Sequence, residues 1–311
     1  MIRVGVIGVG VMGADHARKL ARVVSGSELV AVSDFDPASA AALAAELNAR
    51  VHADGFAMIE DPEVDAVVVA TRDDTHAPLV LAALRAAKPV LCEKPLAPTA
   101  AECREVVAAQ DAAGHPTDLV TVGFMRRFDP SYVALRDRVH GGEFGPALIA
   151  HCVSRTVQTY PGGDSASSIT QSAIHELDIV SWLLGSPIIE VSWLRGRTSA
   201  NSGDRQDPQF YVLRTASDVL VTVELFLNAR YGYDTRCEVV METGTAALPA
   251  AFVLDDAMPS PVHTAPFCDT DFDGNADVGD GQFAAADSFI TRNYECLEFM
   301  RVSTATGVVN G

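Results

Sequence analysis

Lys94 is the first residue whose type and position suit chemistry. It follows the apolar segment 89–92 and lies between Glu93 and Pro95. An ammonium group at the carboxyl end of a buried strand can hydrogen-bond a reacting hydroxyl and stabilise the oxyanion that develops as hydride leaves the carbon. It can also transfer a proton if neighbouring groups lower its pKa. The alternative interpretation is a surface lysine that precedes a turn.

His175 is the second such residue, in a predicted helix over residues 171–185 that a glycine and a following proline bring to an end. Gln171, His175 and Asp178 are spaced by four and three residues, which places them on one face of a regular helix. His175 can accept the proton of an alcohol while Asp178 orients the imidazole. The alternative is a structural histidine, the commoner use of a single histidine in an amphipathic helix.

The N-terminal segment predicts where a redox cofactor would bind. Residues 8–13 match the pattern G-x-G-x-x-G between an apolar strand and a helix. In this pattern Gly8 permits a tight turn, Gly10 leaves space for a pyrophosphate and Gly13 lets the helix pack on the strand. The helix N-terminus offers N–H groups to the phosphates. The predicted contacts along this loop are Gly8, Gly10, Val11, Met12 and Gly13. The alternative is an ordinary turn in an α/β protein.

Asp34 follows the next apolar strand and lies 21 residues after Gly13. A carboxylate at this position accepts hydrogen bonds from a ribose 2′-hydroxyl and repels a 2′-phosphate. We therefore predict NAD, rather than NADP, as the cofactor.

Strands and helices alternate through the first 122 residues and would position these groups. The segment 64–70 is continuously apolar, as in a central parallel strand buried on both faces. The predicted strands are 2–7, 29–33, 51–52, 64–70, 89–92 and 119–122. The predicted helices are 14–24, 37–47, 78–87 and 99–114, and residues 55–56 are predicted as a turn. This alternation predicts a doubly wound α/β Rossmann domain over residues 1–122, with right-handed crossovers.

The pattern changes beyond residue 123, where helices become sparser and longer strands appear. The predicted strands are 147–157, 188–196, 209–215, 219–227 and 235–242. Apolar and polar residues alternate in 219–225, as in an antiparallel sheet with one face covered. We predict a second, α+β domain over residues 123–311 with a large open, mainly antiparallel sheet.

The composition excludes several classes of partner. A chain of 311 residues with 48% apolar content can form two domains with cores. The net charge of −18 disfavours nucleic acid and anionic membranes. The sequence contains no apolar run of membrane-spanning length, and the first strand begins where a signal peptide would lie. The six cysteines are scattered without a CxxC pair, which fits free thiols in the cytoplasm.

The order of these motifs along the chain resembles that in a known enzyme family. The glycine loop, Asp34, the Glu-Lys-Pro triplet at 93–95, the segment 123–130 and the segment 174–178 occur in this order. In combination they resemble the Gfo/Idh/MocA oxidoreductase family. Within that family, two further segments resemble the inositol 2-dehydrogenases, namely 151–155 and 228–238. The resemblance extends over roughly residues 1–250.

The resemblance implies a fold, an activity and roles for individual residues. It implies a Rossmann domain, and a second domain that binds substrate and whose sheet mediates oligomerisation, often as a homotetramer. It implies NAD-dependent oxidation of a ring hydroxyl of inositol or a related cyclitol or sugar to a ketone. Lys94 corresponds to the catalytic lysine and His175 to the acid/base histidine. Gln171 is the third catalytic candidate. Further cofactor contacts would come from Thr71, His76, Glu93 and Lys94, and substrate contacts from Met125, Arg126, Gln171, His175 and Tyr233. Without the resemblance, Arg126 is a surface cation and Tyr233 a core aromatic residue.

Gln171 departs from the inositol dehydrogenase pattern, which has aspartate four residues before the histidine. Glutamine can hydrogen-bond a substrate but has no charge to hold Lys94 or His175 in a chosen protonation state. Three interpretations stay open at this point: a cyclitol dehydrogenase, an aldose or aminocyclitol dehydrogenase, and a catalytically impaired family member that binds the dinucleotide.

The likeness fades after residue 250. The segment 269–280 matches part of a calcium-binding loop, with Asp269, Asp271, Asp273, Asp277 and Asp280 as ligand candidates. Three prolines precede it where an entering helix is needed, so an acidic solvated loop is the favoured alternative and we predict no resident metal. Apolar spacing in 283–300 predicts a final helix.

Overall fold

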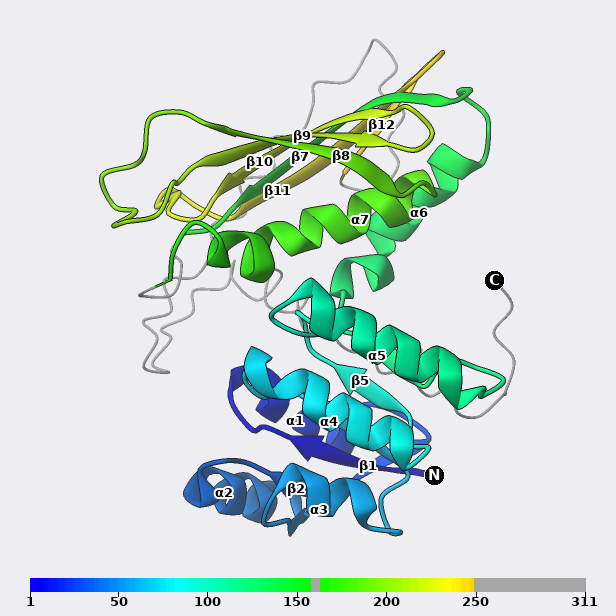
Figure 1. Ribbon diagram of the computed structural model, residues 1–311, viewed down its shortest axis with the longest axis vertical. Coiled ribbons are helices and arrows are strands. Elements are labelled where there is room, and N and C mark those ends of the chain that lie inside the picture. The colour runs from blue at the N-terminus through cyan, green and yellow to red at the C-terminus, as the bar shows by residue number, and fades with distance from the viewer. Residues whose placement is uncertain (158–162, 249–311) are drawn as a thin grey trace. The chain divides into compact units, whose positions relative to one another are not determined.

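The computed structural model describes residues 1–157 and 163–248. These residues divide into two compact units, one of residues 1–125 and one that begins at Arg126 (Figure 1). The domain boundary predicted after residue 122, and the substrate and oligomer roles of the second domain, stay predictions.

A parallel sheet of six strands forms the centre of the first unit, in the order β3-β2-β1-β4-β5-β6. Its strands are β1 (Ile2–Ile7), β2 (Ser27–Ser33), β3 (Arg50–Val51), β4 (Ala66–Val69), β5 (Val90–Cys92) and β6 (Val120–Val122). All four residues of β4 are buried, as its continuous apolar run predicts. The strand order is that of a doubly wound dinucleotide-binding fold, which confirms the predicted fold class.

The helices of this unit begin and end at local signals. They are α1 (Val11–Arg22), α2 (Pro37–Leu47), α3 (Gly55–Glu60), α4 (Asp73–Arg85) and α5 (Ala100–Ala113). Thr99 and Glu102 form a capping box at the start of α5, and Gly114 ends it in the left-handed region at φ 63°.

Two helix predictions for this unit were wrong. Residues 55–56 start α3 rather than a turn, because the Asp54 side chain accepts the Ala57 N–H at 2.8 Å and caps a helix. Helix α4 begins at Asp73 rather than at residue 78. Asp73 and Asp74 occupy its first turn, where carboxylates complement the helix dipole.

The second unit contains a mixed sheet of six strands in the order β12-β11-β7-β10-β9-β8. The strands are β7 (Ala147–Arg155), β8 (Ile188–Arg195), β9 (Gln209–Thr215), β10 (Leu220–Phe226), β11 (Asp234–Met241) and β12 (Thr245–Ala247). Only the β7–β10 pair is parallel among these described strands. The prediction of a mainly antiparallel sheet is therefore confirmed, whereas β12 was not predicted.

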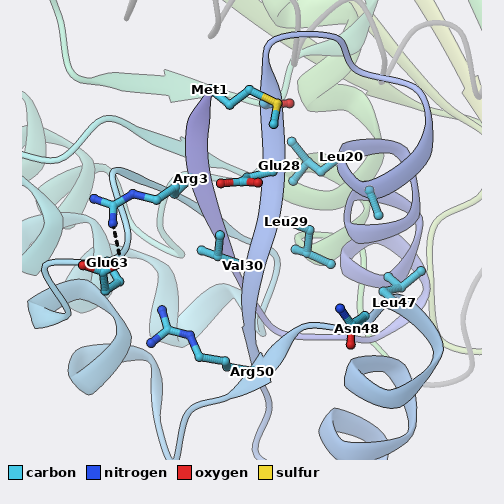
Figure 2. Close-up of a pocket in the computed structure, with 12 residues that line it drawn as sticks. Met1, Arg3, Leu20, Glu28, Leu29, Val30, Leu47, Asn48, Arg50 and Glu63 are labelled. Carbon is cyan, nitrogen blue, oxygen red and sulfur yellow. Dashed lines mark ion pairs between the residues drawn. The ribbon is translucent and has the colours of Figure 1, made fainter.

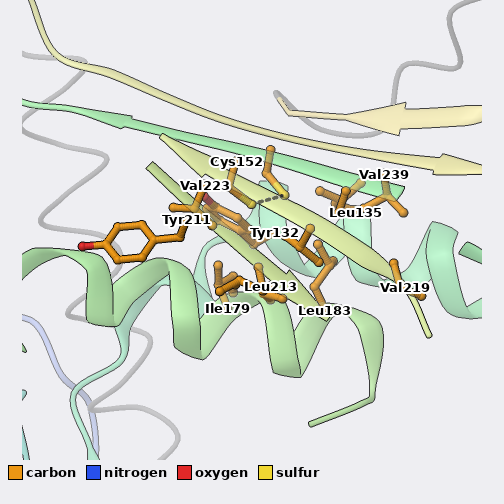
Figure 3. Close-up of a cluster of buried hydrophobic side chains, with 14 of the residues drawn as sticks. Tyr132, Leu135, Cys152, Ile179, Leu183, Tyr211, Leu213, Val219, Val223 and Val239 are labelled. Carbon is orange, nitrogen blue, oxygen red and sulfur yellow. Dashed lines mark hydrogen bonds between the residues drawn. The ribbon is translucent and has the colours of Figure 1, made fainter. Parts of the chain in front are cut away.

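Two α-helices cover one face of this sheet. The helical elements are η1 (Met125–Phe128), α6 (Pro130–His140), η2 (Ile169–Ala173) and α7 (Ile174–Leu184). Figure 3 shows Leu135 of α6 and Ile179 and Leu183 of α7 among the buried side chains of the sheet, including Leu213 and Val223. The alternating pattern of the strands thus buries one face, as predicted.

Helix α6 was not predicted, although its start carries a clear signal. The side chain of Asp129 accepts the Ser131 N–H at 2.9 Å, and Pro130 occupies the first helical position.

Some predictions concern residues outside the described part of the chain. These are the calcium-ligand candidates at 269–280 and the final helix over 283–300. Within the described part, no helix has both the length and the apolar composition of a membrane span. The same residues contain no group of three histidine, cysteine or acidic side chains arranged to hold a metal ion.

Candidate active site

The carboxyl ends of the parallel strands bring the predicted cofactor residues to one edge of the first unit. Gly8 follows β1, Asp34 follows β2, Thr71 comes shortly after β4, and Lys94 comes shortly after β5. Backbone N–H groups just beyond β1, β4 and β5 bond the last carbonyls of neighbouring strands at 2.8 Å. This is the edge at which doubly wound sheets bind their ligands.

The glycine loop has the geometry that a dinucleotide needs. Gly8 has φ +89°, and a Cβ there would lie 2.5 Å from the Ala70 carbonyl oxygen. A Cβ on Gly13 would lie 1.8 Å from the Gly8 carbonyl oxygen, so only glycine permits the close packing of loop and helix. A Cβ on Gly10 meets no described atom within 4 Å, so this position faces open space. No described side chain caps α1. Its first N–H groups therefore fit a pyrophosphate.

Asp34 is held at the end of this loop by two backbone N–H groups. Its Oδ2 accepts the Val9 N–H at 2.6 Å, and its Oδ1 accepts the Asp36 N–H at 2.8 Å. The two bonds fix the direction of the carboxylate. A ribose would find an acceptor already oriented, and a 2′-phosphate would meet a negative charge.

Lys94 is half-buried at the same edge. Burial lowers the pKa of its ammonium group, and the nearby carboxylates of Glu93 and Asp73 partly oppose that shift. A lysine with a lowered pKa exchanges a proton more readily than a solvated lysine.

Glu93 forms a hydrogen-bonded pair with a histidine that the sequence analysis missed. The Nε2 atom of His16, on α1, lies 2.8 Å from Glu93 Oε1, and His16 is 1% exposed. Burial raises the pKa of Glu93, but His16 and Lys94 outweigh burial and hold this pKa below its usual value. The carboxylate of Glu93 therefore stays charged next to Lys94 in the chain. The available signal was a histidine three residues after Gly13, on the helix that follows the glycine loop.

His76 links the loops that follow β4 and β5. It is 1% exposed, with Nδ1 at 2.7 Å from the Pro95 carbonyl oxygen and Nε2 at 3.1 Å from the Thr71 carbonyl oxygen. Both ring nitrogens thus contact the protein backbone. His76 thus connects the two loops through their backbone, and its direct contact with cofactor stays a prediction, as does that of Thr71.

Within the second unit, the helix that carries His175 has an unexpected first turn. Gln171 lies in η2, a π-helical turn, and His175 and Asp178 lie in α7. The predicted regular helix from residue 171 is therefore wrong for its first turn, because π-helical bonds join residues five apart rather than four. Single π-turns inside helices are frequent at functional sites. His175 and Asp178 keep the α-helical spacing that places them on one side.

Arg126 and Tyr233, both predicted to contact substrate, belong to this unit. Arg126 is 4% exposed and forms an ion pair with the buried carboxylate of Glu176. Arg126 is therefore not the surface cation that its sequence alone suggests. Met125 lies beside it in η1. Substrate contact by these residues stays a prediction.

A cavity of about 580 Å³ lies elsewhere on the first unit, at the amino ends of β1 and β2 (Figure 2). Met1, Arg3 and Glu28 line it, together with Leu47 and Asn48 at the end of α2. Because it lies at the edge of the sheet opposite the glycine loop, it is not the cofactor site.

Comparison with known proteins places both units in one family. Residues 2–124 match the oxidoreductase family with an NAD-binding Rossmann fold, Gfo/Idh/MocA. Residues 132–247 match a C-terminal domain of the same family. The chain belongs to the Gfo/Idh/MocA family.

Several family members that are similar to this chain carry the name inositol 2-dehydrogenase. Inositol 2-dehydrogenase 2 of Paenarthrobacter aurescens is 55% identical over 256 residues, which cover 81% of this chain and 77% of that protein. Inositol 2-dehydrogenase 1 of Saccharopolyspora erythraea is 48% identical over 258 residues, covering 81% of this chain and 76% of the relative. A crystal structure of myo-inositol dehydrogenase from Lactobacillus casei with NAD(H) and myo-inositol matches with a TM-score of 0.82 and 29% identity. That match covers 97% of this chain and 87% of the other.

Asp34 allows a direct test of cofactor choice in this family member. In Asp34→Ser, the ratio of the NADPH to the NADH dissociation constant should fall at least about tenfold, because the substitution removes both a ribose acceptor and a charge that repels a 2′-phosphate. The ratio can be measured by the fluorescence of the reduced nicotinamide. Asp34→Asn is the companion variant, since it removes the charge and retains one acceptor for the loop N–H groups, and the ratio should fall in this variant too. An unchanged ratio in both variants would show that Asp34 does not select the cofactor.

Proposed function

We propose that this protein is an NAD-dependent dehydrogenase that oxidises a ring hydroxyl of inositol or a closely related cyclitol to a ketone. The observation that carries the proposal is the position of Lys94. It follows β5 at the same sheet edge as the glycine loop and Asp34, where a bound nicotinamide and a hydroxyl substrate have to meet. The substrate class is supported by the inositol 2-dehydrogenases that resemble this chain across both units.

The residues present fit NAD. The loop of Gly8, Gly10 and Gly13 would hold the pyrophosphate and Asp34 the adenosine ribose. When bound, NAD supplies the acceptor for the hydride that leaves the substrate carbon.

The proton of the same hydroxyl goes to the protein. Lys94 donates a hydrogen bond to the reacting oxygen and stabilises the charge that develops on it. His175 accepts the proton, so the carbon loses a hydride, the oxygen loses a proton and a carbonyl remains. Tyr233 and Met125 would help to orient the ring through the contacts predicted for them.

A second candidate function rests on Gln171. A family member that binds dinucleotide without turnover is favoured if the missing carboxylate has removed the proton relay. The two candidates are separated by NADH absorbance with a panel of cyclitols, aminocyclitols and aldoses. Turnover that is fastest with a cyclitol supports the first. Faster turnover with an aldose or aminocyclitol changes the substrate class, and NADH binding without turnover on any member supports the second.

We also infer that the protein forms a homo-oligomer, as a dimer or tetramer, in the cytoplasm. The inference is supported by the face of the second sheet opposite α6 and α7, where Leu194, Phe210 and Leu220 are exposed among the described residues. Exposed apolar residues on neighbouring strands favour burial against another subunit. The cytoplasmic location is supported by four described cysteines, all of which are free thiols. Light scattering coupled to size exclusion tests the subunit number, and a monomer would overturn the inference.

A further inference from the structure

Two consecutive arginines contact the helix that carries His175. Arg126 donates from its guanidinium to Glu176, and the two side chains are 5% and 1% exposed. Arg127 contacts Asp178 with two N–H groups, one of them Nε, which lies 2.9 Å from Oδ2. The side chain of Asp178 is 8% exposed. The two acids lie within three residues of His175 along the chain.

The two pairs fix the rotation of α7 about its axis. Successive residues of an α-helix are about 100° apart, so Glu176 and Asp178 project on sides that differ by about 200°. The apolar face of α7, with Ile179 and Leu183 in the core, prevents large rotations of the helix, whereas one ion pair on one side still permits small rotations about that contact. Two pairs from one dipeptide to two sides of the helix oppose these small rotations and thereby help to set the direction of His175.

Stability alone does not explain the buried ion pair between Arg126 and Glu176. Burying two charges costs desolvation energy that the attraction between them often fails to recover, and apolar residues of similar size are then equally or more stable. The pair also leaves Arg126 Nε and Glu176 Oε2 buried without a hydrogen-bond partner among the described residues. Helix α7 already packs through Ile179, Val180 and Leu183. The Arg126–Glu176 pair therefore contributes to the orientation of α7 rather than to the free energy of its packing.

We propose that Arg126 and Arg127 are positioning residues, which clamp α7 through Glu176 and Asp178 and thereby aim His175 at the reacting hydroxyl. This inference rests on the proposed function, because the aim of His175 matters only if His175 transfers the proton. It assigns Arg126 a role through Glu176, beside the direct substrate contact that the resemblance implies.

Glu176→Gln and Asp178→Asn test the clamp, because each removes one charge and keeps the volume of the side chain. Each should lower kcat for inositol oxidation about tenfold or more, while KM for NAD stays within about twofold. The melting temperature should fall by several degrees for Glu176→Gln, which leaves the buried guanidinium of Arg126 without its counter-charge, and should stay within a few degrees of wild type for Asp178→Asn, whose partner Arg127 is exposed to solvent. Glu143→Gln is the matched control, since it breaks the exposed pair with Arg138 and should leave kcat unchanged.

A double-mutant cycle separates positioning from a general structural effect. In a His175→Asn background, Glu176→Gln should lower kcat less than about threefold, because its effect acts through His175. An equal loss in both backgrounds, or no loss in wild type, would overturn the clamp.

A second readout does not depend on activity and keeps the two proposals distinct. Nitrogen NMR of the His175 imidazole should show changed shifts in Glu176→Gln and Asp178→Asn and unchanged shifts in Glu143→Gln. Unchanged shifts in all three variants would overturn the clamp. A wild-type protein without turnover on any cyclitol would instead overturn the proposed function.

Discussion

Lys94→Met will lower kcat for inositol oxidation by about 1,000-fold or more and will change the NADH dissociation constant by less than about threefold. The substitution removes both the hydrogen bond to the developing oxyanion and a group able to take part in proton transfer, and each contribution is typically worth two or more orders of magnitude. The glycine loop and Asp34 stay intact, so cofactor binding persists. Steady-state kinetics and fluorescence titration of NADH measure the two quantities.

The stability of the same variant provides the control. The pKa of Lys94 is lowered in the folded protein, so folding releases its proton between that pKa and the higher pKa of the unfolded chain. The free energy of unfolding of wild type therefore gains a contribution as the pH rises through this window, and below the window the charged lysine reduces stability. Lys94→Met lacks this pH-dependent contribution. Urea unfolding should show that the free energy of unfolding of Lys94→Met exceeds that of wild type at neutral pH, and that this difference shrinks as the pH becomes alkaline. A constant difference would show that Lys94 has no perturbed pKa, and unchanged kcat would exclude it from catalysis.

Gln171→Asp should raise kcat for inositol oxidation by about 100-fold. A carboxylate in the π-turn before α7 would restore a negative charge that favours the protonated forms of Lys94 and His175. It could also transfer a proton, and groups that do so typically raise the rate by two to four orders of magnitude. The side chain of Gln171 is exposed in the second unit, so an added charge causes little desolvation cost. Steady-state kinetics of the purified variant measure the change.

Gln171→Asn is the matched control for this gain. It shortens the side chain as aspartate does but adds no charge, so kcat should stay near or below that of wild type. An equal rise in both variants would attribute the effect to side-chain length. No rise in Gln171→Asp would show that this protein has replaced the aspartate by other means or acts on a different substrate.

The first unit was largely predictable because its signals are local. The continuous apolar run of β4, the glycine loop and the capping box of α5 each specify an element without reference to distant residues. Helix α6, which was not predicted, also has a local signal in Asp129 and Pro130, and this signal overlaps the family motif over residues 123–130.

The partners of the site residues were not predictable in the same way. His16 contacts Glu93 across 77 positions of the chain, and Arg126 contacts Glu176 across 50. Pairs of this kind depend on tertiary packing, which neither helical spacing nor strand alternation encodes. The π-turn at Gln171 is a similar case, because it changes the spacing of side chains without a distinctive residue type.

A structure of the protein with NADH and myo-inositol bound tests the central claim most directly. We predict that Lys94 Nζ and a ring nitrogen of His175 both lie within about 3 Å of the same substrate oxygen, whose carbon faces the nicotinamide. An arrangement in which either group contacts neither substrate nor cofactor would contradict the proposed dehydrogenase mechanism.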